Sequence, residues 1–544
     1  MNRFGGLALA TILLFPLAVM ADEKGHDDGA PPEQLGEVSF PTSCTPAAQK
    51  NFVRGVALLH SFWYGEAGKA FESAATEEPG CAMAYWGVAM SLWHPLWEPP
   101  DEQSLADAWA AIQKAEAAGT KTPRERDYVG AIKTYYQDYK TREPAARAAA
   151  YEKAMAGVAQ RYPEDREAAI FHALALIATA SPTDSNHTHR KAAGAQLEKL
   201  FAEMPNHPGL AHYIIHTYDN PALAGRGLEA ARRYAKIAPS ASHALHMPSH
   251  IFTRLGLWQE SLESNLAAAQ AASEAMARGQ QGRANQLHAL DYAEYAALQS
   301  GRDAEAARLA EEIRQITATA LEKSQGEEAY DIAFGHALTL SRYAIELRNW
   351  KDAAALPVIG QHSVPSLLAH ATRAIGSARS GDVKQARAEI AQMEVIVEKL
   401  RGDRYAYGER PGTVELDQAR AWLAQAEGKK KDALKLMRSV VEDVEAGKRN
   451  AQSYPPVVPA REMLADLMIE QGKAAEALKE YERALAHSPK RFNALYGAAH
   501  AAELAGQKAQ ASAYYAQLLR VTGGGANSSR PELARAKSEA SGGK

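Results

Sequence analysis

One spacing of residues recurs along the chain and limits the folds that it can adopt. Intervals of 12, 4, 3 and 5 residues separate five positions near the N-terminus, and the last three intervals return near the C-terminus. Small residues at these offsets let two helices of a hairpin pack closely, a large residue fills the gap between neighbours, and the proline ends the second helix. The first set is Gly55, Ala67, Phe71, Ala74 and Pro79, and the second is Ala477, Tyr481, Ala484 and Pro489.

The rest of the sequence indicates an all-α fold. Between residues 46 and 520, alanine- and leucine-rich amphipathic segments of helical length are punctuated by Gly and Pro, and an alternating strand pattern is almost absent. The pattern resembles the tetratricopeptide repeat, a helix–turn–helix unit of about 34 residues, and we count about nine to eleven such hairpins. The resemblance implies a right-handed superhelical solenoid. Its concave groove would be lined by the first helix of each repeat, at repeat positions 2, 5, 9, 12 and 13.

A second resemblance concerns location. Residues 51–97, "HMPSHI" at 246–251 and "PPVVPAREML" at 455–464 are similar to a subgroup of secreted bacterial tetratricopeptide proteins. This resemblance implies fold and location only. The N-terminus agrees with it, because Arg3 precedes a short apolar run and small residues at Val19 and Ala21 favour cleavage after Ala21. A retained anchor is the alternative. Without it, no transmembrane segment is expected, and we predict a periplasmic or secreted protein.

The expected organisation has four parts. A signal peptide (1–21) precedes a polar, Pro- and Gly-rich leader (22–40) that we expect to be disordered. The solenoid (41–520) has N-terminal hairpins (41–100), a histidine-rich groove section (205–300) and C-terminal repeats (458–520). A flexible tail follows (521–544).

The two cysteines, Cys44 and Cys81, should form a disulfide if the chain is exported, since the oxidising compartment favours it. Two buried free thiols are the alternative. A redox-active pair is not expected, because the C-x-x-C spacing is missing.

Two pairs of histidines follow the repeat. Pro205 and Pro239 lie 34 residues apart (239 − 205 = 34) and each fits the proline that ends a repeat. In this register two histidines occupy positions 5 and 9 of one repeat, and two more occupy the same positions of the next (246 − 212 = 34; 250 − 216 = 34). Residues four apart share a helix face, so both pairs should line one wall of the groove. These residues are His212 and His216, then His246 and His250.

Further candidates share this wall. His243 falls at position 2, and Asp219, at position 12, is placed to orient a histidine. The spacing from Gly256 to Gly301 is 45 residues, which implies an insertion (301 − 256 = 45); allowing for it puts His288 at position 2 and Asp291 at position 5. Imidazoles with one or two carboxylates favour copper or zinc. The absence of H-E-x-x-H removes the usual base of a metalloprotease.

Elsewhere the register brings His60 and His94 to position 13 of two repeats, beside aromatic residues such as Trp93. They form either an aromatic-rimmed ligand pocket or a seal on the end of the solenoid, and the seal is favoured. Arg254 and Arg342 are groove candidates for a carboxylate, with surface ion pairing as the alternative.

Two functions remain open. The first is an exported solenoid with a copper or zinc site in its groove; if it is an enzyme, the activity expected is that of a metal-dependent oxidoreductase or hydrolase. The second is a scaffold that holds a peptide or protein partner without metal. A net charge of −4 gives no sign of nucleic-acid binding, and no nucleic-acid partner is expected.

Overall fold

The computed structural model describes residues 33–96, 99–360, 362–401, 413–447 and 456–541. The chain divides into residues 1–33 and 34–544, and the description below concerns the second unit. The predicted signal peptide and residues 22–32 of the leader lie outside the described residues. Within the described ranges every regular element is a helix.

The bounds of the helices are, in order, α1 (Pro46–His60), α2 (Tyr64–Glu77), α3 (Ala82–Ser91), α4 (Glu102–Ala118), α5 (Pro123–Tyr136), α6 (Pro144–Arg161), α7 (Arg166–Ala178), α8 (Thr188–Glu203), α9 (Pro208–Tyr218), η1 (Ala224–Gly227), α10 (Leu228–Ile237), α11 (Ser242–His246), α12 (Pro248–Arg254), α13 (Trp258–Ala277), α14 (Arg283–Gln299), α15 (Asp303–Ala320), η2 (Leu321–Lys323), α16 (Gly326–Glu346), α17 (Trp350–Ala354), α18 (Ser363–Ser380), α19 (Val383–Arg401), α20 (Thr413–Ala426), α21 (Lys430–Glu445), α22 (Ala460–Glu470), α23 (Ala474–His487), α24 (Phe492–Leu504), α25 (Lys508–Val521), η3 (Gly523–Gly525) and α26 (Pro531–Ser541).

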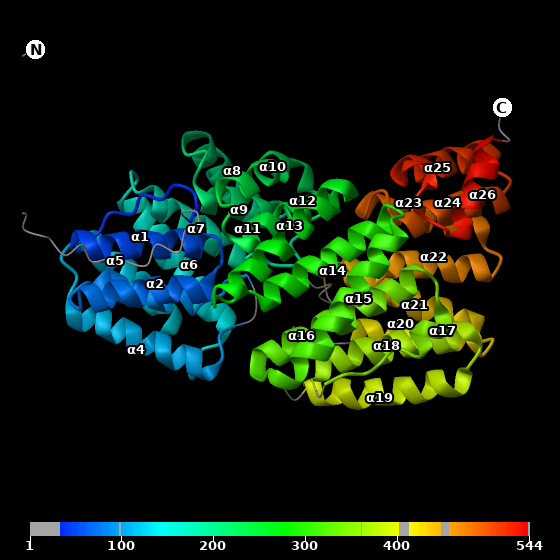
Figure 1. The fold of residues 1–544 in the computed structure, drawn as a ribbon, viewed down its shortest axis with the longest axis horizontal. Helices are drawn as coiled ribbons and strands as arrows, with labels where there is room; N and C mark the ends of the chain where they lie inside the picture. Colours follow the sequence, from blue (N-terminus) through cyan, green and yellow to red (C-terminus); the bar gives the residue numbers. More distant parts are fainter. Residues whose placement is uncertain (1–32, 97–98, 361, 402–412, 448–455, 542–544) are drawn as a thin grey trace, which may run out of the picture. The chain divides into compact units, whose positions relative to one another are not determined.

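Consecutive helices pack in pairs, and each pair packs on the next, which makes the described chain an all-α solenoid of hairpins (Figure 1). The pairs run from α1–α2 to α24–α25, with α11 and α12 together serving as one first helix. Twelve pairs result within the described residues, against nine to eleven expected. The α16–α17 pair departs from the regular hairpin, because its second helix, α17, has only five residues.

The recurring small and large residues do what their spacing predicts. A Cβ atom added at Gly55 would lie 2.7 Å from the Phe71 ring, and one added at Gly87 would lie 2.2 Å from it. At the other end, a Cβ at Gly497 would lie 2.3 Å from Tyr481. Each aromatic ring therefore sits where two helix backbones have come close, and a buried core continues from hairpin to hairpin.

The insertion expected between Gly256 and Gly301 is taken up in part by a long second helix. Helix α13 has 20 residues, whereas the corresponding α2 has 14. The turn before α13 also touches a distant part of the chain, since the Trp258 indole N–H donates to the carbonyl of Lys490 at 2.9 Å. The C-terminal repeats thus pack against the turn that follows α12.

Residues 34–40 do not show the disorder predicted for the leader. Phe40 is 1% exposed and packs against the Phe52 and Trp86 rings. The Glu37 N–H donates to the carbonyl of Asn206 at 3.0 Å. A polar, Gly- and Pro-rich composition concealed one aromatic anchor, whose burial fixes this stretch on the solenoid.

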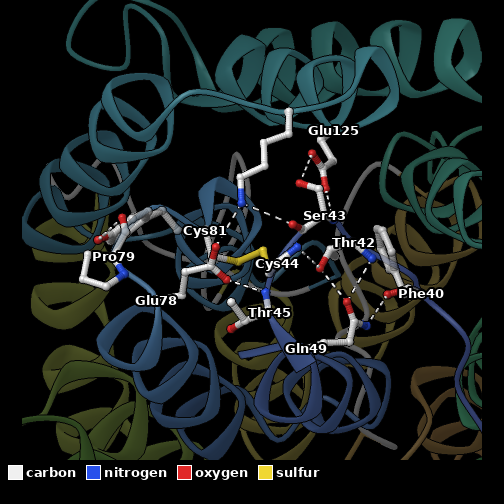
Figure 2. Close-up of a disulfide and its surroundings, with 12 residues drawn as sticks. Phe40, Thr42, Ser43, Cys44, Thr45, Gln49, Glu78, Pro79, Cys81 and Glu125 are labelled. Carbon is white, nitrogen blue, oxygen red and sulfur yellow. Dashed lines mark hydrogen bonds and ion pairs between the residues drawn. A yellow bond between two sulfur atoms is a disulfide. The ribbon is translucent and has the colours of Figure 1, made fainter. Parts of the chain in front are cut away.

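The predicted disulfide joins Cys44 to Cys81 with a Cα–Cα distance of 5.3 Å. Figure 2 shows it among polar contacts between the segment before α1 and the loop before α3. Glu78 accepts from the Thr45 N–H and from Lys121, and Ser43 donates to Glu125. The disulfide therefore ties the N-terminal segment to the second hairpin.

The C-terminal tail is also more ordered than predicted. Helix α26 buries Leu533 and Ala536, which are 1% and 0% exposed and share one face. Arg530 donates to Asp303 of α15 at 2.9 Å. The glycine- and serine-rich start of the tail hid this short amphipathic helix. Across the described residues, no helix combines the length and the apolar character needed to cross a membrane.

Candidate metal centre

Four helices bring six histidines to one wall of a groove. Helix α9 supplies two, α11 and α12 supply three, and α14 supplies one. These helices pack on one another directly, α9 on α12 and α11 on α14, and their labels lie in the green part of the ribbon in Figure 1. Pro248 lacks an N–H and separates α11 from α12. The six are His212, His216, His243, His246, His250 and His288.

The six rings form two groups. We call His212, His216 and His243 the first trio, and His246, His250 and His288 the second trio. Within each trio one nitrogen from every ring lies within 4.8 Å of the others. The trios adjoin, because the ring centroids of His243 and His246 are 5.9 Å apart and those of His216 and His250 are 6.2 Å apart. The sequence prediction that both pairs share one wall agrees with this geometry.

Three rings are oriented by acceptors behind them. The Nδ1–H of His212 donates to the carbonyl of His60 at 2.6 Å. The Nδ1–H of His250 donates to the Asp219 carboxylate at 2.8 Å. The Nδ1–H of His246 donates to Oδ1 of Asn265 at 2.6 Å. The amide of Asn265 is held in this orientation because its Nδ2 donates to the carbonyl of Ser261.

These contacts fix the tautomers of three rings, and in His246 and His250 they leave two lone pairs facing each other. A neutral ring that carries its proton on Nδ1 has a bare Nε2. The Nε2 atoms of His246 and His250 are 2.9 Å apart, and those of His212 and His216 are 3.1 Å apart. Two bare nitrogens at 2.9 Å repel. A proton on one ring or a metal ion is needed between His246 and His250.

Burial keeps most of the rings neutral. It lowers the pKa values of His212 and His288 to about 3. Burial, followed by the effect of neighbouring histidines, lowers the pKa values of His216, His243 and His246 well below their ordinary value. Neutral imidazole is the form that binds metal ions.

Asp219 stands behind His250 and also contacts Arg254, whose Nε donates to it at 2.7 Å. Burial acts to raise the pKa of the Asp219 carboxyl, but Arg254 and His250 outweigh it and hold this pKa well below its usual range. The carboxylate is therefore ionised and accepts hydrogen bonds only. The sequence placed Asp219 as a residue that orients a histidine, and the structure puts it in contact with His250.

The histidine wall opens on a groove of about 2580 Å³. Two members of each trio line it: His216 and His243, and His250 and His288. His212 and His246 are 0% and 2% exposed and do not line the groove, so each trio has a buried ring at its back. A ligand in the groove can reach both trios.

Asp291 lies outside the two trios. Its carboxylate accepts from Arg342 and from Thr339, and both Asp291 and Arg342 are buried. The structure thus joins two residues that the sequence assigned to separate roles, Asp291 as a possible ligand and Arg342 as a groove cation. Their ion pair links α14 to α16.

His60 and His94 do not share a pocket. His94 stacks on Tyr64 with ring centroids 4.0 Å apart, and both line the groove. Trp93 is 3% exposed and packs between Tyr135 and Tyr151, which agrees with a sealing role.

His60 belongs to a buried polar cluster that the sequence did not indicate. Its Nε2 contacts Glu167 at 2.9 Å and its Nδ1 contacts the Tyr213 hydroxyl at 2.9 Å. The other Glu167 oxygen contacts His207 at 3.0 Å. Burial opposes it, but His60 and His207 lower the pKa of Glu167 to about 2. Since the carbonyl of His60 holds His212, this cluster supports the first trio from behind.

Comparisons with known proteins show which sequences and folds the helical repeats resemble. Residues 468–527 match the tetratricopeptide repeat family, and no curated protein matches the chain. Among solved structures, a human IFIT1 dimer with m7Gppp-AAAA is 13% identical, with 85% of this chain and 94% of that chain covered and a TM-score of 0.36. A tetratricopeptide repeat protein from Parabacteroides merdae is 14% identical, with 55% and 98% covered and a TM-score of 0.29. The matched segment is a tetratricopeptide repeat, and helix hairpins of the same helix–turn–helix kind run through the described residues.

Proposed function

We propose that this protein binds copper or zinc through the histidines of its groove and acts as an exported metal-binding solenoid. The observation that carries the proposal is the pair of Nε2 atoms of His246 and His250, which face each other at 2.9 Å while Asn265 and Asp219 hold both Nδ1 protons. Ligating histidines in metal sites almost always donate their second N–H to a carboxylate, a carbonyl or water. Here the Nε2 atoms of His246 and His250 already point toward a shared position.

The spacing of the donors suits a metal ion. Bonds of about 2.0–2.1 Å put two neighbouring nitrogens about 2.9 Å apart at a right angle and about 3.4 Å apart in a tetrahedron. The separations of 2.9 Å and 3.1 Å in the two pairs lie at the right-angled end of this range. Tetragonal coordination is typical of Cu(II), which also binds more tightly than zinc to a given nitrogen site. Copper is therefore favoured.

The histidines and Asp219 would have different roles in binding the ion. His212 and His246 are held at the buried back, and His216 and His288 lie at the side of the groove where exchangeable ligands enter. A bound ion would supply Lewis acidity or, as copper, electron transfer. Asp219 would raise the basicity of His250 through its Nδ1 proton.

A metal-free groove is the second candidate. The volume of about 2580 Å³ and aromatic linings such as Phe62, Tyr64 and Phe334 suit an extended peptide. In that case a proton, instead of a metal ion, lies between the Nε2 atoms of His246 and His250.

Metal analysis separates the two. The tag-free, full-length chain is produced with export, purified without chelators and analysed for copper and zinc, together with His246→Ala and a matched control, His172→Ala. His172 lies in α7, is 19% exposed and contacts Glu152 of α6, outside the two trios. We expect bound metal in the parent and in His172→Ala but not in His246→Ala. A parent chain that stays metal-free after incubation with Cu(II) and Zn(II) would leave the peptide groove as the function.

A further inference from the structure

We propose that the groove holds two metal ions, one in each trio, about 6 Å apart. This inference rests on the proposed metal binding and adds to it a number of ions, a separation and an assignment of ligands. It starts from the way in which the repeat generates the ligands.

The two trios are copies of one arrangement. Each takes positions 5 and 9 of one repeat and position 2 of the next. The first two members are one repeat apart (246 − 212 = 34; 250 − 216 = 34). The third members are 45 residues apart (288 − 243 = 45), and this is also the spacing from Gly256 to Gly301 (301 − 256 = 45). Both intervals span the long helix α13, which accounts for part of the extra length, and a whole ligand set has been repeated.

Each trio also has its own hydrogen-bond acceptors, which orient its rings. In the first trio the backbone carbonyl of His60 fixes His212. In the second, Asn265 fixes His246 and Asp219 fixes His250. A wall that served one ion would need only one set of oriented rings. Two independently oriented sets indicate two positions for ions.

The distance between the two proposed ions follows from rings that occupy the same position in neighbouring repeats. His216 and His250 occupy the same repeat position, and their centroids are 6.2 Å apart. Ions that sit in the same way in each trio are displaced by about the same distance. Two-metal sites bridged by a single atom have ions about 3.5–4 Å apart. The ions here would be too far apart for such a bridge, but close enough for their electron spins to interact through space.

Both positions face the same space. His216 and His243 from the first trio and His250 and His288 from the second line the groove. A small ligand of two or three linked atoms, entering from the groove, has the length to contact both ions, whereas a single oxygen atom does not. The geometry thus suits a short polyatomic ligand that bridges the two ions.

Copper titration with electron paramagnetic resonance tests the inference. The full-length chain is stripped of metal and titrated with Cu(II) alone. We expect two Cu(II) per chain, a narrow spectrum at low loading and, at two equivalents, dipolar broadening with a half-field signal. One Cu(II) per chain would overturn the pair of ions and leave metal binding intact. No bound Cu(II) would overturn both, and two ions without broadening would place the second one elsewhere.

Single substitutions assign the ligands. His243→Gln removes a ligand of the first trio, although His243 lies on the same repeat as the second trio's His246. His288→Gln removes a ligand of the second trio. We expect each variant to bind one Cu(II) with a narrow spectrum, and His172→Gln to bind two. Loss of both ions in either variant, with thermal unfolding unchanged, would show one composite centre and contradict the inference.

Discussion

Asp219 and His250 are joined by a hydrogen bond of 2.8 Å from Nδ1–H to the carboxylate, and they come from neighbouring repeats. Asp219 follows α9, and His250 lies in α12. The contact therefore orients a ring of one repeat from the end of the first helix of the preceding repeat. Because the ionised carboxylate can only accept, it also sets which nitrogen of His250 faces the second trio.

Replacing Asp219 by Asn should weaken copper binding. The amide is neutral and can turn its NH₂ toward His250, so the preference for the Nδ1–H tautomer is lost. Loss of such an outer contact typically lowers metal affinity by about 10–100-fold. We expect a shift of this size in a competition titration against a chelator of known affinity.

Two further variants separate this effect from damage to the fold. Asp219→Asn leaves Arg254 without its carboxylate, so the double variant Asp219→Asn/Arg254→Met removes the stranded cation. Asp303→Asn breaks another partly buried pair, with Arg530. The double variant should still bind copper weakly, while Asp303→Asn should bind it as the parent does. Recovery of affinity in the double variant would contradict the role given to Asp219.

Gly209 should be needed to place the first trio. A Cβ atom there would lie 2.5 Å from Nδ1 of His60, whose ring is held by Glu167 and Tyr213 and has little room to move. Gly209→Ala should push the start of α9 away from α1 and draw His212 off the carbonyl of His60. We expect a loss of about 1–3 kcal/mol in unfolding free energy and weaker copper binding. Gly225→Ala, where an added Cβ meets nothing within 4 Å, is the control.

Glu167 should give the protein a stability that depends on pH. Its pKa falls from an ordinary 4.5 to about 2, with burial opposing and His60 and His207 lowering it. A carboxyl with a lowered pKa stabilises the fold fully above its unfolded value, and this contribution disappears as the pH falls through about 2.

Glu167→Gln should therefore unfold at lower denaturant concentration than the parent at pH 7, and the gap should narrow between pH 4.5 and pH 2. Urea unfolding followed by circular dichroism across this range measures it. Glu152→Gln, which removes a partly exposed contact to His172, is the matched control and should show a small, nearly constant difference. A gap that stays constant down to pH 2 would show that the Glu167 charge contributes nothing.

The histidine wall could be predicted from the sequence because the repeat dictates it. Once two prolines set the register, His212, His216, His246 and His250 fall on one face by spacing alone, and His243 and His288 follow. The groove position of Asp219 came from the same register. These positions depend only on spacing within and between neighbouring repeats, and the stacking of hairpins keeps that spacing.

The contacts that decide the chemistry of each ring depend on chain segments that are far apart. His60 of α1 meets Glu167 of α7 across 107 residues, because α1 and α7 both pack on α9. Asp291 stood at a repeat position equivalent to that of His246, yet Arg342 from the next repeat pairs with it across 51 residues. The ordered segments around Phe40 and Leu533 were hidden for a different reason. One or two buried side chains suffice to fix a short segment whose overall composition is that of a loop.

The disulfide provides a last prediction, on stability. Cys44 and Cys81 are 37 residues apart in sequence, and closing a loop of that length stabilises the fold by about 4 kcal/mol in the chain-entropy treatment. Cys44→Ser/Cys81→Ser should lose an amount of this order in urea unfolding. Dithiothreitol should destabilise the parent by the same amount and leave the double variant unchanged. Because the contacts of Glu78 with Thr45 and Lys121 would remain, the double variant should still fold and bind copper. A double variant as stable as the parent would mean that these polar contacts alone hold the N-terminal segment.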